Sequence, residues 1–430
     1  MTVSDTQTSA VTKPEPTRAA EKNPEMGGLM ARLSRWLDRE RWPVPAQTQK
    51  LFTARMTDVA ANRLAREFSL RYGAADPKQR RSLLAALAEA SATLEPRGDQ
   101  GLRLFRRLYA QADSLQSLVE LRADMLRWRN QVAGLGMLER ELEGLLSSWF
   151  DVGMLQLRPI NWDSPASLLE KLIQYEAVHE IRSWEELRHR VADNRRCYAF
   201  FHPRMDNVPL IFVEVAFATH MADNVQVLLD PKVAPPTLDK ARWAIFYSIS
   251  NTQPGLRGIS FGNFLLKRVV DALLLELPRL KSFATLSPMP GFAEWLGKQD
   301  GQAMRALLHD KAERQKAQDD PQAGLTWVER LRAAAGGKAD DAAQRAGLQL
   351  AISYIKTMKN GQPLDPVARF HLGNGARIER VNWGADRSPK GMAQSCAIMV
   401  NYLYDLDQLD DNLIQLAEGK PKTGMNLRWL

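Results

Sequence analysis

The stretch AIFYSISNTQPGLRGISFGNFLLKRVVDALLLELPRLKSFATLSPMPGF, from Ala244 to Phe292, decides the fold of the second half of the chain. An apolar strand ending at Ser250 leads into a glycine-containing loop, which opens directly into an amphipathic helix over 264–277. A second strand follows over 283–287. Free backbone N–H groups and the helix dipole favour an anion at a helix N-terminus. The pattern therefore predicts an anion site at the loop that carries Gly255, Gly258 and Gly262.

The glycine spacing alone does not identify a ligand. It matches neither GxxxxGK[ST] nor GxGxxG, so neither a P-loop nor a dinucleotide fingerprint is supported. A tight turn whose glycines only permit the backbone angles explains the spacing equally well. Arg257 favours a phosphate ligand, because a guanidinium can donate two hydrogen bonds to phosphate oxygens, although a surface arginine is the alternative.

Two further residues occupy positions suited to chemistry. Pro288 removes an N–H and stops the second strand, so Ser287 lies at a strand's carboxyl end, where open α/β sheets often bind ligands. Most Ser-Pro dipeptides at the end of a strand, however, only terminate the strand and have no chemical role. His371 precedes a glycine and asparagine turn in FHLGNG. A lone histidine is more often a packed core residue than a reagent, so the residues alone leave both readings open.

The rest of the chain divides into helical and strand-rich parts. Helical periodicity over most of 29–157, with breaks at glycine and proline, predicts a bundle. We predict an α+β protein with a disordered leader at 1–27, a helical domain at 28–178, and a strand-containing domain at 179–430 with a helical insertion at about 297–361. Short runs rich in β-branched and aromatic residues predict strands at 197–201, 210–216, 225–229, 243–250 and 283–287.

The composition limits the kinds of partner that the protein can be expected to bind. The 58 lysines and arginines exceed the 50 aspartates and glutamates by 8, which favours anionic partners without singling out nucleic acid. Two cysteines without metal-ligand spacing argue against a disulfide scaffold and a metal site. No apolar run approaches the roughly 18 to 20 residues of a membrane span. With no targeting signal found, we expect a cytoplasmic protein that binds neither nucleic acid nor membranes.

Three stretches carry a family resemblance. FYSISNTQPGLRGISFGNFLLKRVV, FATLSPMPGFAEWL and DPVARFHLGNGARIERVNW resemble the malonyl-CoA decarboxylase family, and the similarity extends over nearly the whole chain after the leader. It implies a helical domain that mediates oligomerisation and a catalytic domain with the acyl-CoA N-acetyltransferase (GNAT) fold. It also implies a homo-oligomer, a tetramer built as a dimer of dimers, that acts on malonyl-CoA, releases acetyl-CoA and needs no cofactor.

The resemblance also implies roles for individual residues. The family's catalytic serine and histidine match Ser287 and His371. A glutamate that animal members carry in the coenzyme loop is replaced here by Ser260, so its acid/base role cannot be carried over. The positions that match the family's substrate-binding residues are Ser248, Arg257, Gly258, Ile259, Ser260, Phe261, Gly262, Asn263 and Tyr404.

For the expected reaction the protein must position the substrate, direct hydrogen-bond donors at the developing oxyanion and supply a proton to the carbon. Loss of CO2 from malonyl-CoA leaves an electron pair that the thioester carbonyl accepts as an enolate. Our hypothesis is a hydrogen-bonded pair of Ser287 and His371, in which His371 delivers the proton to the enolate. An acyl-CoA-dependent acyltransferase of the GNAT type is the alternative enzyme, and a basic adaptor protein is the non-enzymatic alternative.

Overall fold

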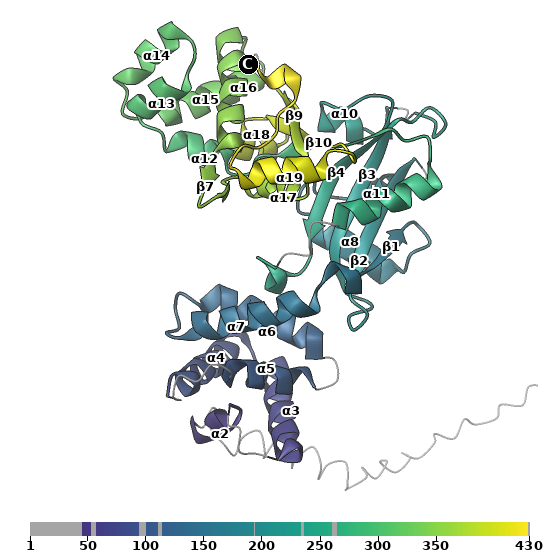
Figure 1. Ribbon diagram of the computed structural model, residues 1–430, viewed down its shortest axis with the longest axis vertical. Coiled ribbons are helices and arrows are strands. Elements are labelled where there is room, and N and C mark those ends of the chain that lie inside the picture. The colour runs from purple at the N-terminus through teal and green to yellow at the C-terminus, as the bar shows by residue number, and fades with distance from the viewer. Residues whose placement is uncertain are drawn as a thin grey trace, which may run out of the picture.

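The computed structural model describes residues 45–52, 57–93, 100–110, 114–192, 194–233, 236–259 and 265–428. The predicted disordered leader lies outside this described part of the chain. A helical bundle forms one end of the molecule, a mixed sheet its middle and a group of helices the opposite end (Figure 1). The predicted α+β class, with a helical bundle before the sheet, is confirmed.

The bundle follows the apolar periodicity of its sequence. In its last helix Leu138, Leu142, Leu145 and Leu146 recur at three or four residues and are all buried. These side chains belong to one continuous apolar core that also includes residues of the sheet. The bundle is therefore packed onto the second half of the chain. Its helices are α2 (Pro45–Lys50), α3 (Asp58–Ala74), α4 (Pro77–Ala92), α5 (Gln100–Tyr109), α6 (Ser114–Trp128) and α7 (Leu135–Trp149).

The sheet has the order β1-β2-β3-β4-β5-β10-β6, and β9 pairs with β10. Among the named strands of the described residues, only β4 and β5 pair in parallel, and the helix α11 connects them. All other pairs are antiparallel. The strands are β1 (Gln156–Ile160), β2 (Arg195–Phe201), β3 (Pro209–Ala218), β4 (Trp243–Asn251), β5 (Ser282–Thr285), β6 (Ser287–Pro288), β9 (Arg377–Asn382) and β10 (Met399–Tyr404); a separate hairpin joins β7 (Met358–Lys359) and β8 (Gln362–Pro363).

Two segments differ from the expectation. Residues 225–229, predicted as a strand, form a short helix because the Asn224 side chain accepts a hydrogen bond from the Val227 N–H at 3.0 Å and caps it. Residues 156–160, assigned to the helical domain, form edge strand β1, where Pro159 is tolerated. We therefore propose that the domain boundary lies between α7 and β1 rather than at residue 178.

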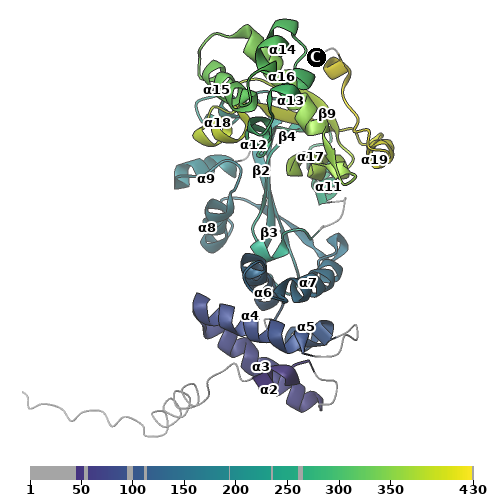
Figure 2. The same ribbon diagram turned by 90° about the vertical axis from the view of Figure 1, so that its left-hand side faces the viewer.

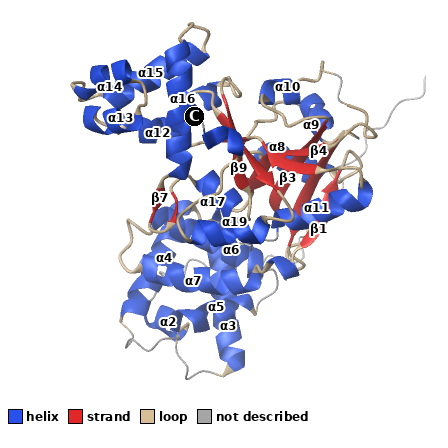
Figure 3. Cartoon of the chain, turned by 45° about the horizontal axis from the view of Figure 1, so that its top comes forward, coloured by secondary structure: helices blue, strands red, loops and turns tan. Residues whose placement is uncertain are grey.

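Helices cover both faces of the sheet. Helices α8 and α9 lie on one side, and α11, α17 and α19 lie on the other (Figure 2). Figure 3 shows the strands enclosed between these helices, with the inserted helices projecting beyond them. The described residues contain no helix long and apolar enough to cross a membrane. The remaining helices are α8 (Ala166–Tyr175), α9 (Trp184–Arg190), α10 (Val225–Leu229), α11 (Leu265–Glu276), α12 (Phe292–Gly297), α13 (Gly301–Leu307), α14 (Lys311–Gln318), α15 (Ala323–Ala335), α16 (Asp341–Lys356), α17 (Pro366–Gly373), α18 (Pro389–Ser395) and α19 (Leu409–Ala417), with single 3-10 turns η1 (Val152–Met154), η2 (Pro254–Leu256) and η3 (Met425–Arg428).

Candidate active site

Ser287 lies where two neighbouring strands separate. The parallel strands β4 and β5 pair as far as Phe246 with Thr285. Beyond this point β4 continues along β3, whereas the chain after β5 pairs with β10, with Ser287 opposite Val400. Ligands of open α/β sheets bind outside the carboxyl ends of parallel strands. Ser287 is therefore at the position in this sheet where a ligand is expected.

His371 is positioned by a short, firmly capped helix. The buried Asp365 carboxylate accepts hydrogen bonds from two backbone N–H groups of the first turn of α17 at 2.8 and 2.9 Å, and Pro366 follows it. His371 lies in the last turn and is 3% exposed. Gly375 then adopts φ +84°, and a Cβ there would lie 2.9 Å from atoms of Leu409. Only glycine fits this turn, which returns the chain towards β9.

A chain of hydrogen bonds joins side chains from three distant segments. Ser287 Oγ lies 3.1 Å from His371 Nε2, and His371 Nδ1 lies 2.8 Å from the Tyr404 hydroxyl. On its other side, Ser287 Oγ donates to Thr285 Oγ1 at 2.9 Å, and Thr285 Oγ1 also accepts from the Tyr402 N–H at 3.1 Å. The hydrogen bond between Ser287 and His371 that the sequence analysis hypothesised is present, and Tyr404 extends it.

The protonation states of this chain follow from its burial. Burial lowers the pKa of His371 to about 3 and raises the pKa of the Tyr404 hydroxyl well above its usual range, so both are neutral at pH 7. Since the Ser287 proton is given to Thr285, His371 Nε2 must carry the proton shared with Ser287 Oγ. We therefore assign Nδ1 as the acceptor from Tyr404.

The buried neutral imidazole predicts a pH dependence of stability. In the unfolded chain His371 is protonated below about pH 6.5. In the folded protein the same side chain is protonated only below about pH 3. The unfolded state binds more protons in this window, so stability falls as the pH falls through it. Lowering the pH from 7 to 4.5 should cost about 2 to 3 kcal/mol through this group. Urea unfolding at both pH values should show that loss in the wild type and a smaller loss in His371→Asn. Equal losses in both proteins would contradict it.

A cavity of about 130 Å³ lies beside Tyr404. Its walls come from the first half of α11, from Asn374 after α17, from the end of β10, and from α19 with the segment that precedes it. The cavity is lined by Leu266, Lys267, Val270, Asn374, Tyr404, Leu406, Leu409, Asp410 and Leu413.

The predicted coenzyme loop is described only in part. Arg257 and Gly258 are exposed, Gly258 has φ +84°, and Ile259 is buried in the main core. These residues follow η2 and precede α11, whose first turns line the cavity beside Tyr404. Ser260, Phe261, Gly262 and Asn263, also predicted to bind substrate, lie outside the described residues.

Ser248 does not join this chain of side chains. Its hydroxyl donates to both carboxylate oxygens of Glu176, at 2.8 and 2.7 Å, and lies 3.1 Å from Ser250 Oγ. A bulge in β4 at Tyr247 places Ser248 against the segment that follows α8. Among the described residues no hydrogen bond links Ser248 to Ser287 or His371, so its predicted contact with substrate stays a prediction.

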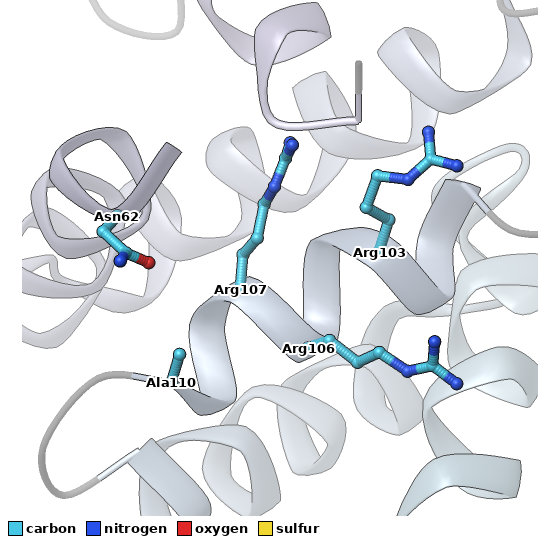
Figure 4. Close-up of a pocket in the computed structure, with 5 residues that line it drawn as sticks. All are labelled: Asn62, Arg103, Arg106, Arg107 and Ala110. Atoms are coloured by element: carbon cyan, nitrogen blue, oxygen red, sulfur yellow. The ribbon is translucent and has the colours of Figure 1, made fainter. Parts of the chain in front are cut away.

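Two other hollows lack the predicted residues. One, of about 1020 Å³, lies between α9, α10 and α18, and both acidic and basic side chains line it. The other, of about 260 Å³, lies in the bundle beside three arginines of α5 (Figure 4). There Arg107 and Arg103 donate to the carbonyls of Leu51 and Phe52, at 2.8 and 3.3 Å, and Arg106 points away from them. The three guanidinium groups are therefore not all directed at one point.

Thr285 and Asp365 were missed by the sequence analysis. Thr285 could have been found, because residues two apart on a strand face the same side and Thr285 precedes Ser287 by two. Asp365 before Pro366 is the sequence signature of a helix start, which places His371 in a helix rather than beside a loop. Among the described residues, no cluster of three or more potential metal ligands was found.

The fold and site define an α+β protein with a buried Ser-His-Tyr chain at a strand divergence. Two family models match it, the malonyl-CoA decarboxylase N-terminal domain over residues 60–150 and the malonyl-CoA decarboxylase C-terminal domain over residues 153–422. The chain belongs to the malonyl-CoA decarboxylase family. The predicted GNAT-like class of the catalytic domain stays a prediction.

Individual relatives agree with this assignment. The goose (Anser anser anser) protein named "Malonyl-CoA decarboxylase, mitochondrial" is 37% identical over 331 residues, which are 72% of this chain and 64% of the goose protein. The mouse (Mus musculus) protein of the same name is 36% identical, over 74% of this chain and 68% of its own. The match thus spans about two thirds of the length of these relatives.

Solved structures of bacterial relatives are also similar. The crystal structure of malonyl-CoA decarboxylase from Cupriavidus metallidurans has a TM-score of 0.79 and 50% identity, covering 89% of this chain and 97% of that chain. The corresponding structure from Rhodopseudomonas palustris has a TM-score of 0.74 and 37% identity, covering 90% and 98%. The similarity therefore includes both the helical bundle and the sheet.

Proposed function

We propose that this protein decarboxylates malonyl-CoA to acetyl-CoA and CO2 without a prosthetic group. Family membership supports the substrate, since the similar proteins are named malonyl-CoA decarboxylases. The observation that carries the proposal is the buried chain from Ser287 through His371 to Tyr404 at the strand divergence.

The reaction is proposed to pass through a thioester enolate. When the bond between the α-carbon and the carboxylate breaks, CO2 leaves and its electron pair moves into the thioester carbonyl. Donors aimed at the resulting oxyanion lower the barrier most in a site that excludes water. The Ser287 hydroxyl, 6% exposed, would turn from Thr285 to this oxyanion or to the substrate carboxylate.

His371 is proposed to protonate the enolate carbon. Its Nε2 proton moves to the carbon, Nδ1 takes the Tyr404 hydroxyl proton, and Tyr404 regains a proton from water in the adjoining cavity. The imidazole thus stays neutral overall, which suits a site whose burial penalises an imidazolium. One proton is consumed for each CO2 released.

The coenzyme is proposed to bind along the loop before α11. Arg257 and Gly258 are exposed there, and the cavity from α11 to Tyr404 would receive the thioester end. In this proposed arrangement the phosphate groups of the coenzyme would lie near a helix N-terminus and the acyl group would lie near the hydrogen-bonded chain. The substrate-binding role predicted for Ser248 is part of the same proposal.

A direct assay tests the function. Incubating the purified protein with malonyl-CoA alone should release CO2 and acetyl-CoA in equal amounts. An acyltransferase would instead require an amine acceptor and would transfer the malonyl group intact. Turnover that appears only after an amine is added would favour that alternative and contradict a decarboxylase.

Tyr404→Phe should lower kcat about tenfold and leave KM nearly unchanged, because the variant keeps the ring packing but removes the hydroxyl that reprotonates His371. Steady-state kinetics with malonyl-CoA provides the measurement, and Tyr175→Phe, on α8, is a matched control. An unchanged kcat would show that the Tyr404 hydroxyl only holds the ring.

The assembly and location stay predictions. A homo-tetramer, as a dimer of dimers, predicts about four times the mass of one chain in light scattering after gel filtration. The cytoplasmic location is tested by cell fractionation, and it stands against curated relatives that are named mitochondrial.

A further inference from the structure

A buried arginine of the helical bundle holds the start of the proposed coenzyme loop. Arg122, on α6, is 1% exposed. One of its terminal nitrogens donates to the carbonyl of Gly255 at 2.7 Å and to the carbonyl of Arg257 at 2.9 Å. Both acceptors lie in or just after η2, between β4 and α11. The contact therefore links two segments that are more than 130 residues apart.

The remaining donors of Arg122 are fixed by carboxylates of α7. Its Nε donates to Glu139 Oε1 at 3.0 Å, and its other terminal nitrogen lies 2.9 Å from the same oxygen. That nitrogen also lies 3.1 Å from Glu143 Oε1. Glu139 is itself buried, so the pair is desolvated and its geometry is held tightly. Two adjacent helices thus orient the guanidinium towards the loop.

The loop backbone also packs directly on the bundle. A Cβ at Gly255 would lie 1.8 Å from the carbonyl oxygen of Val119 on α6, so only glycine allows this approach. A Cβ at Gly258, where φ is +84°, would lie 3.0 Å from Glu143 Oε1. The same acidic side chain therefore contacts Arg122 and the second loop glycine.

We propose that Arg122 is a positioning residue for coenzyme A binding, which it supports by fixing the loop backbone from Gly255 to Ile259. This inference rests on the proposed function of that loop. Arg122 has no contact with Ser287 or His371 among the described residues, so it should act on binding and not on the chemical step. The helical bundle then has a direct part in substrate binding in addition to any part in assembly.

The test is Arg122→Lys, which keeps the charge but loses the planar set of donors that reaches two carbonyls and two carboxylates. The KM for malonyl-CoA and the Kd for coenzyme A should rise about tenfold while kcat changes less than about twofold, as expected for loss of uniform binding. Exchange of the backbone amide hydrogens should become faster over residues 252–259 but not over residues 282–288 or 366–373. Arg127→Lys, an exposed arginine of the same helix, is the matched control and should behave as the wild type.

Gly255→Ala provides a second, independent variant that displaces the same backbone from Val119 and should raise KM in the same way. The proposal is overturned if Arg122→Lys leaves KM and Kd unchanged, or if it lowers kcat while exchange increases throughout the protein. Wild-type protein that binds coenzyme A but releases no CO2 from malonyl-CoA would instead refute only the proposed function. Wild-type protein that does not bind coenzyme A would refute both.

Discussion

Replacing His371 with asparagine should lower kcat for CO2 release from malonyl-CoA by about a thousandfold, within the range found for loss of a positioned general acid. The side chain is 3% exposed and bonded at both ring nitrogens, to Ser287 and to Tyr404. The asparagine side chain has no ring with two nitrogens, so it cannot take up a proton on the Tyr404 side and release one on the Ser287 side. KM should change little, because none of the described residues of the proposed coenzyme loop forms a hydrogen bond with the His371 side chain.

The comparison requires folded protein, which circular dichroism and coenzyme A binding establish. His309→Asn, at an exposed histidine, is the matched control and should retain full activity. A folded His371→Asn variant with near-normal CO2 release would exclude His371 as the proton donor.

Ser287→Ala should lower kcat about a hundredfold, which is the lower end of the effect of removing one oxyanion donor. The variant deletes the hydroxyl that bridges His371 and Thr285 but keeps the strand pairing, since Ser287 contributes to β6 through its backbone. The pairing of Val400 with this position should therefore survive. Thermal unfolding should show a midpoint close to that of the wild type.

Ser282→Ala, at the first residue of β5, is the control for a serine of the same sheet that lies outside the chain of hydrogen bonds. Steady-state kinetics of both variants with malonyl-CoA separates the two positions. If Ser287→Ala has the kcat of the control, the serine only ends its strand.

The strand-loop-helix-strand unit was predictable because its signals are local. Apolar runs end at a glycine loop, the helix has a single apolar face, and the structure has β4, α11 and β5 in that order. The prediction of a strand at 225–229 was wrong because a five-residue apolar run fits a strand and a short helix equally well, and the cap by Asn224 decides between them.

The site itself could not be derived from spacing. Ser287 and His371 are 84 residues apart, and Tyr404 lies 33 residues further on, so only the tertiary fold brings them together. The resemblance named all three, whereas the residues alone left open whether His371 is a reagent or a packed core residue. The contact of Arg122 with the loop had no sequence signal, because a buried arginine and a surface arginine on an amphipathic helix look alike.

The place of β10 in the sheet has a consequence for biosynthesis. Of the strands in the described part of the chain, β10 (Met399–Tyr404) is the last in sequence, but it lies in the sheet between β5 and β6, and it also pairs with β9. A ribosome-bound chain that has not yet emerged to residue 404 lacks the strand that joins these three and the hydroxyl that bonds His371. The nascent protein should therefore gain activity in a single step, only after residue 404 has left the ribosome.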